Sequence, residues 1–101
     1  MNAKEELLKH VKQRQIKCAE IQYVEGFTKC EKTFNLKVGY SVDDLEKFLR
    51  YLDFEYDDGF GGQELFGLVW YEDGTWSERN EYDGSEWWEY KKTPEIPLSL
   101  K

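Results

Sequence analysis

The sequence contains few of the residues that build metal sites, disulfide frameworks or membrane spans. Its 101 residues include two cysteines, Cys18 and Cys30, together with one histidine, one methionine and two prolines. The cysteines have neither a CxxC spacing nor companion histidines, so we predict no disulfide, no metal site and no cofactor. No apolar run is long enough to cross a bilayer, and the charged N-terminus is unlike a signal peptide. These absences predict one soluble, cytoplasmic domain over residues 1–101, without a membrane partner.

The residues needed for catalysis are also scarce. His10 lies in a predicted helix without a nucleophile nearby, so we expect a surface residue rather than a general base. The glycine-rich segment 57–62 lacks the lysine and spacing of a phosphate loop, and it lacks the alternating aspartates of a calcium loop. Glutamates such as Glu78 and Glu89 have the right chemistry for glycoside hydrolysis, but that reaction needs two walls of a cleft rather than one small sheet. We therefore predict that the protein is not an enzyme.

Charge and aromatic residues are distributed unevenly along the chain. Residues 1–52 hold eight acidic and ten basic side chains, whereas residues 53–95 hold thirteen acidic and three basic ones. The second segment also holds eleven of the seventeen aromatic residues. This asymmetry argues against direct binding of nucleic acid and favours a basic partner, while acidity that serves only solubility is the alternative.

Hydrophobic periodicity predicts the elements of the first half. Residues 3–15 have the pattern of an amphipathic helix, and residues 16–24 and 30–39 alternate as strands with one buried face. A second helix begins at Ser41, whose side chain is placed to cap free amides while Asp44 completes a capping box. Residues 1–52 therefore predict a helix, a hairpin and a second helix.

Two Asp-Gly pairs organise the second half. They separate three runs rich in aromatic and β-branched residues, namely Phe66 to Glu72, Thr75 to Tyr82 and Glu86 to Tyr90. This is the pattern of a three-stranded antiparallel meander, and a short strand over 54–56 is a possible addition before it. We predict an α+β fold of order α-β-β-α-(β)-β-β-β, with both helices on one face of an antiparallel sheet and residues 92–101 as an extended tail.

Two-residue turns at both Asp-Gly pairs would fix the register, with Glu72 opposite Thr75 and Tyr82 opposite Ser85. That register predicts a core face of the meander made of Phe66, Leu68, Trp70, Ser77, Arg79, Trp88 and Tyr90. It predicts a second face made of Val69, Tyr71, Trp76, Glu78, Asn80, Trp87 and Glu89.

The second face is the candidate binding surface. Glu78 is expected opposite Glu89, a repulsion of about 1 kcal/mol at ~4 Å in water that stability alone would not favour. Carboxylates in a lattice flanked by indoles suit a basic, nucleic-acid-binding protein, since they would substitute for phosphates. We predict that the partner-binding residues are Trp76, Glu78, Asn80, Trp87 and Glu89, with Asp57 and Asp58 in the adjoining loop.

Three other interpretations of this face remain open. Its tryptophans could cover the sheet while the acids keep it soluble. Trp76 and Trp87 could stack on a carbohydrate or peptide, which would make the chain a small ligand-binding module. A symmetric dimer through the same indoles would also explain them, so monomer and homodimer both remain open.

One run of sequence resembles a known group of proteins. Residues 62–97 contain DGTW-x-ER-x-EYDGSEWWEY followed by P-x-IP, and this run resembles small proteins encoded by tailed bacteriophages and prophages. That group has no settled activity. The resemblance implies a phage accessory protein in a bacterial host. Small acidic phage proteins often look like antagonists of host defence or of host nucleic-acid enzymes.

Overall fold

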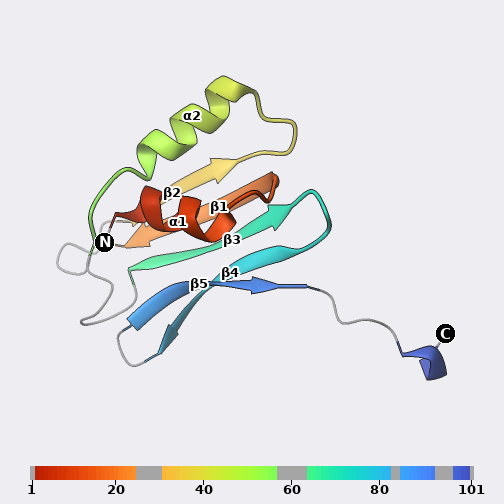
Figure 1. Cartoon of the computed structure of the whole chain (residues 1–101). Coiled ribbons are helices and arrows are strands. Elements are labelled where there is room, and N and C mark those ends of the chain that lie inside the picture. Colours follow the sequence, from red (N-terminus) through yellow and green to blue (C-terminus); the bar gives the residue numbers. More distant parts are fainter. Residues whose placement is uncertain (1, 25–30, 57–63, 83–84, 93–96, 101) are drawn as a thin grey trace.

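The computed structural model describes residues 2–24, 31–56, 64–82, 85–92 and 97–100. Figure 1 shows two helices and five strands followed by a single 3₁₀ turn. In chain order they are α1 (Ala3–Val11), β1 (Ile16–Val24), β2 (Glu31–Leu36), α2 (Val42–Tyr51), β3 (Leu65–Tyr71), β4 (Trp76–Tyr82), β5 (Ser85–Lys91) and η1 (Leu98–Leu100). The predicted α+β class and element order are confirmed.

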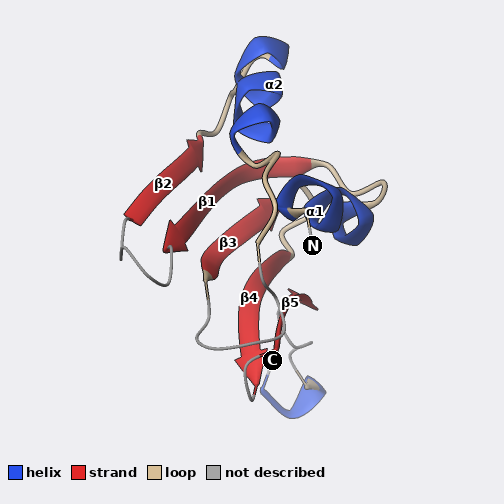
Figure 2. Cartoon of the chain, turned by 90° about the vertical axis from the view of Figure 1, so that its left-hand side faces the viewer, coloured by secondary structure: helices blue, strands red, loops and turns tan. Residues whose placement is uncertain are grey.

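The strands form one antiparallel sheet in the order β2-β1-β3-β4-β5, so β2 and β5 are its edges. Figure 2 shows the twist of the sheet, with α1 lying over its middle and α2 over the end near β2. Residues 53–56 form no strand, and Glu55 makes only an isolated bridge to Asn2. The turn η1 lies apart from the sheet, with Leu98 and Leu100 exposed.

Local capping explains where the helices begin and end. The side chain of Asn2 accepts a hydrogen bond from the amide of Glu5 and starts α1. The helix ends at Val11 because Lys12 has a φ of 55°, so the predicted helix over 3–15 was too long. In α2 the predicted capping box is confirmed, with reciprocal bonds between Ser41 and Asp44.

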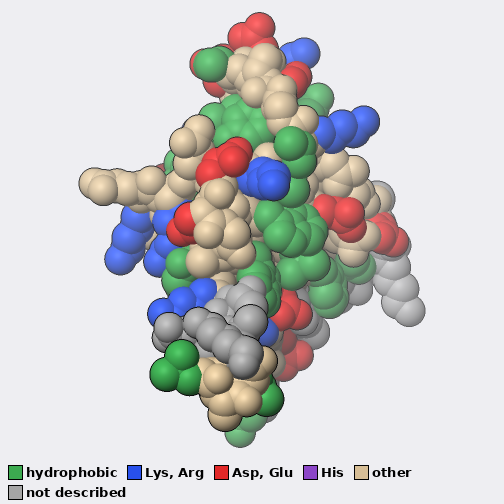
Figure 3. All heavy atoms as spheres, turned by 90° about the vertical axis from the view of Figure 1, so that its right-hand side faces the viewer, with side chains coloured by type: hydrophobic (Ala, Val, Ile, Leu, Met, Phe, Trp, Pro, Cys, Tyr) green, Lys and Arg blue, Asp and Glu red, His purple; other side chains and the backbone are tan. Residues whose placement is uncertain are grey.

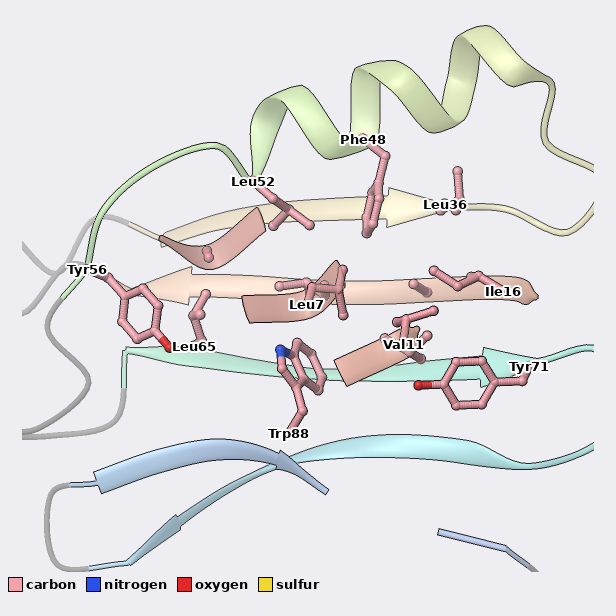
Figure 4. Close-up of a cluster of buried hydrophobic side chains, with 14 residues drawn as sticks. Leu7, Val11, Ile16, Leu36, Phe48, Leu52, Tyr56, Leu65, Tyr71 and Trp88 are labelled. Carbon is pink, nitrogen blue, oxygen red and sulfur yellow. The ribbon is translucent and has the colours of Figure 1, made fainter. Parts of the chain in front are cut away.

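The core lies between the helices and one face of the sheet (Figure 4). Leu7 and Val11 from α1 and Phe48 from α2 pack against strand residues that include Val69 and Tyr71, and all five are buried. Full burial of such a side chain contributes roughly 1.5–3 kcal/mol, so this face supplies most of the hydrophobic stabilisation.

The turn between β3 and β4 differs from the prediction. The amide of Tyr71 donates to the carbonyl of Thr75 over 2.9 Å, which leaves a three-residue loop rather than a two-residue one. Gly74 adopts the positive φ of 87°, and the side chain of Asp73 accepts a bond from the Thr75 amide. Trp70 therefore lies opposite Trp76. This is one residue out of the predicted register.

A slip of one residue exchanges the faces of β3. Val69 and Tyr71, predicted for the binding face, are buried in the core. Phe66, Leu68 and Trp70, predicted for the core, lie on the other face of the sheet. The register of β4 with β5 is confirmed, because Glu78 does face Glu89 and Tyr82 does face Ser85.

Candidate functional site

The sheet face opposite the helices carries a concentration of aromatic side chains. We call it the open face, and among the described residues no helix lies over it. Phe66, Trp70 and Trp87 are 37%, 38% and 40% exposed, and Trp76 is partly buried. The residues that β3, β4 and β5 contribute to it are Phe66, Leu68, Trp70, Trp76, Glu78, Asn80, Trp87, Glu89 and Lys91.

The cross-strand pairing arranges this face in rows. Trp70 lies opposite Trp76, and the next row places Leu68 opposite Glu78 and Glu78 opposite Glu89. On the other side of Leu68 the same row continues to Glu20 of β1. One row across four strands therefore carries three carboxylates beside a row of two indoles, with strands ~4.8 Å apart.

The carboxylates of this row are not all free. Lys91 donates to Glu78 over 2.8 Å, and that hydrogen bond is the main reason why the pKa of Lys91 is raised. The side-chain amide of Asn80 donates to Glu89. Both contacts relieve the repulsion between Glu78 and Glu89, which explains how the sheet tolerates two facing acids.

A shallow hollow of about 310 Å³ lies between the exposed aromatic and acidic groups. Glu20 and Glu78 border it together with Phe66, Leu68 and Trp70. Its volume is at the lower limit for small-molecule sites, which suits one long side chain of a partner better than a whole ligand.

Behind the open face, a buried ion pair fixes β4 to β5. The Arg79 and Glu86 side chains are both 0% exposed, and Arg79 Nη2 donates to Glu86 Oε1 over 2.8 Å. Glu86 also accepts the amides of Glu64 and Leu65. The Arg79 guanidinium lies 5.4 Å from the centroid of the Trp88 ring.

The same arginine links the sheet to the helix layer. Its Nη1 lies 2.9 Å from Glu6 of α1 as an ion pair, although the geometry is not that of a directed hydrogen bond. Arg79 Nη2 also donates to the Tyr56 hydroxyl, which in turn donates to Glu6. Burial and the bond to Glu6 raise the pKa of Tyr56, which stays protonated. We call the four linked side chains of Glu6, Tyr56, Arg79 and Glu86 the buried pin, because they join the helix layer to the sheet.

The position of His10 also differs from the prediction. It was expected at the surface, but its Nε2 lies 2.7 Å from Ser77 Oγ, which is also 2.6 Å from the Tyr71 hydroxyl. Burial, followed by repulsion from Arg14, lowers the pKa of His10. A histidine beside a serine resembles a nucleophilic dyad. Ser77 is 0% exposed, however, so no substrate could reach its hydroxyl without unfolding the core.

The structure brings five of the seven predicted site residues together. Trp76, Glu78, Asn80, Trp87 and Glu89 share the open face. Asp57 and Asp58 lie outside the described residues, as does Cys30, while Cys18 is a free thiol.

The sequence prediction omitted Phe66, Leu68 and Trp70 from this face because it assumed the wrong turn length, and it also left out Glu20 and Lys91. No local signal distinguishes the two turn lengths, because an Asp-Gly pair is compatible with hairpin loops of two and of three residues.

Not every side of the molecule is uniformly acidic. Figure 3 shows hydrophobic, acidic and basic side chains interspersed on the side that contains the turn between β3 and β4. Within the described ranges, no helix is long and apolar enough to cross a membrane. The same residues contain no cluster of three or more histidine, cysteine or acidic side chains that could hold a metal ion.

Comparison with known proteins adds no assignment. No protein-family model matches the chain, and neither curated proteins nor solved structures gave a match.

Proposed function

We propose that this chain is a non-catalytic binding protein whose open face docks a basic partner protein. The observation that carries the proposal is the row of Glu20, Glu78 and Glu89 beside the facing indoles of Trp70 and Trp76. An arginine of a partner can stack on an indole while its guanidinium binds a carboxylate, and such desolvated anchors dominate interface energies.

The exposure of the aromatic residues supports this proposal. A sheet covered by helices on one face normally presents polar residues on the other, whereas here Phe66, Trp70 and Trp87 are each more than a third exposed. Large apolar groups gathered on one surface mark interaction sites in soluble proteins. Arginine and lysine are the side chains that match both the indoles and the acids.

The finer proposal is a phage-type accessory protein that acts in the bacterial cytoplasm on a nucleic-acid-binding host protein, with carboxylates in place of phosphates. Glu20 and Glu89 have no ion-pair partner among the described residues, and this supports the proposal. Lys91 neutralises Glu78, so the row resembles an array of phosphates only in part. Aromatic anchoring therefore contributes more to the proposed contact than a phosphate-like array does.

Affinity capture tests the proposal. Tagged wild type is compared with Glu78→Lys combined with Glu89→Lys, in bacterial lysate at low and at moderate salt. A matched control, Glu46→Lys combined with Glu72→Lys, makes the same change in net charge at exposed positions away from the open face. We expect a basic protein to be captured by wild type and by the control, lost in the open-face variant and weakened by salt.

Other outcomes would contradict the proposal. Equal capture by all three proteins would place the contact elsewhere. Wild type that sediments as a dimer and loses it on Trp87→Ser would assign the face to self-association. Saturable binding of an oligosaccharide with little dependence on salt would favour the ligand-binding alternative, in which the indoles stack on sugar rings.

A further inference from the structure

A second hollow lies between α2 and β2. Its volume is about 990 Å³, at the upper end of the range for binding sites. One wall is α2, with Lys47, Phe48 and Tyr51, and the other is β2, with Phe34 and its neighbours. We call it the α2–β2 groove.

Helix α2 buries one side chain completely, and Leu45 and Leu49 are partly buried against the core. Of its residues only Phe48 is buried, although the helix is strongly amphipathic in sequence. Val42 and Tyr51 are 73% and 62% exposed. An amphipathic helix stabilised by its own core would bury more of its apolar stripe, so part of this stripe has no cover in the described chain.

Aromatic rings line the groove in a continuous series. The centroids of Phe34 and Tyr51 lie 6.1 Å apart with an interplanar angle of 18°, and those of Phe34 and Phe54 lie 6.2 Å apart. Tyr23 follows at 4.6 Å from Phe54. The Phe34 and Tyr51 rings are stacked, whereas the other two pairs are tilted by 38° and 56°.

The rim of the groove is cationic. Lys32, Lys37 and Lys47 line it and are exposed, against the two carboxylates Asp44 and Glu55. The charge is opposite in sign to that of the whole chain, which is −7. An occupant with acidic groups would be complementary to this rim.

The edge of the sheet forms the third part of the site. β2 pairs only with β1, so its other edge has no strand partner among the described residues. Backbone amides and carbonyls on such an edge are a template for an added strand. All residues from Lys32 to Lys37 line the groove, and Lys32, Phe34 and Leu36 lie on the same face of β2.

We propose that the α2–β2 groove binds an extended, acidic peptide segment of a protein partner, which adds as a sixth strand at β2. Its apolar side chains at alternating positions pack on Phe34, Phe48 and Tyr51, and its acidic side chains meet Lys32 and Lys47. This proposal does not rest on the function of the open face, and either can fail while the other stands.

The probe is the peptide Glu-Phe-Thr-Leu-Thr-Val-Asp-Glu-amide with fluorescein on its N-terminal amine, titrated with the full chain and followed by fluorescence anisotropy. Two matched peptides accompany it. One carries proline in place of the second threonine, which removes a strand hydrogen bond, and the other carries lysine in place of every acidic residue. We expect saturable binding of the first peptide and at least about tenfold weaker binding of both others.

Protein variants locate the site. Lys32→Glu combined with Lys47→Glu should weaken the acidic peptide about tenfold, and Tyr51→Ser should weaken it several-fold. Lys9→Glu combined with Lys92→Glu is the matched control, because both residues are exposed, the charge change is the same and neither lines the groove. Amide chemical-shift changes on binding should concentrate on β2 and α2.

The proposal is overturned if the acidic peptide fails to saturate, if the control variant loses as much affinity as the groove variant, or if the shift changes fall on β4 and β5. Equal affinity for the proline peptide, with displacement by sodium decanoate, would identify a small apolar anion as the occupant instead. A dimer dissociated by the Lys32→Glu and Lys47→Glu changes would identify a second copy.

Discussion

Replacing Arg79 with methionine tests the buried pin between the helix layer and the sheet. The Arg79 side chain is 0% exposed and binds Glu86, which is also 0% exposed. Methionine keeps the apolar stem but removes the charge. Among the described residues, the buried Glu86 then keeps two hydrogen-bond donors, the backbone amides of Glu64 and Leu65. Removing one partner of such a pair costs about 3–5 kcal/mol.

That loss is large against the total stability of a chain of this size, about 5–15 kcal/mol, but it should leave a folded population to measure. Urea unfolding followed by tryptophan fluorescence gives the free energy of unfolding for each variant. The matched control is Arg50→Met, which makes the same substitution at an exposed position of α2 and should change stability by less than about 0.5 kcal/mol.

A second-site change separates the charge from the packing. Combining Arg79→Met with Glu86→Gln removes the buried negative charge. The amides of Glu64 and Leu65 bond to different oxygens of Glu86, so glutamine keeps an acceptor for one of them, and we expect the double variant to recover at least about 1 kcal/mol of the loss. A double variant no more stable than Arg79→Met would show that the loss comes from packing, and a loss below about 1 kcal/mol would refute the buried-pair argument altogether.

Three further predictions use unfolding measurements on single variants. Gly67→Ala should destabilise by about 1–3 kcal/mol more than Gly39→Ala, because both glycines have positive φ but only the Cβ at 67 would meet a backbone oxygen, at 2.5 Å; equal losses would contradict this. The pKa of His10 is lowered in the folded protein, so protonation of His10 favours the unfolded state. The free energy of unfolding should therefore fall as pH drops below 6.5, and His10→Gln should flatten that dependence. Ser41→Ala should cost about 1 kcal/mol by removing the cap of α2, and no change would mean that α2 does not depend on it.

The buried pin and the open face are two sides of the same pair of strands. Arg79 and Trp88 point into the core while their neighbours on either side, such as Asn80 and Trp87, point out, because side chains alternate along a strand. Fixing the inner set by an ion pair and by burial also fixes where the outer indoles stand. A preorganised surface loses less side-chain entropy on binding, which favours a docking role for this face.

The two proposed sites have opposite charge. The open face is acidic, with Glu20, Glu78 and Glu89, whereas the rim of the α2–β2 groove carries Lys32 and Lys47 among its exposed groups. Such an arrangement permits two different partners at once, since each surface repels the partner of the other.

Local interactions were predictable from the sequence by itself. The capping box of Ser41 and Asp44, the bounds of β1 and the register of β4 on β5 depend on residues close together in the chain and on strict alternation. For the same reason the sequence placed Trp87 and Glu89 on one face without any tertiary information.

The tertiary structure decided the turn length at Asp73, and with it the faces of β3. An Asp-Gly pair is compatible with turns of two or three residues, so local chemistry left two registers open. Pairing of Ala19 with Val69 and packing of Tyr71 under α1 selected the one that buries the aliphatic and tyrosine side chains and leaves Trp70 outside. The partnership of Arg79 with Glu6 likewise joins residues far apart in the chain. The docking of α1 on the sheet brings that carboxylate to the guanidinium. The physical reason is that a buried charge is costly unless an opposite charge lies beside it.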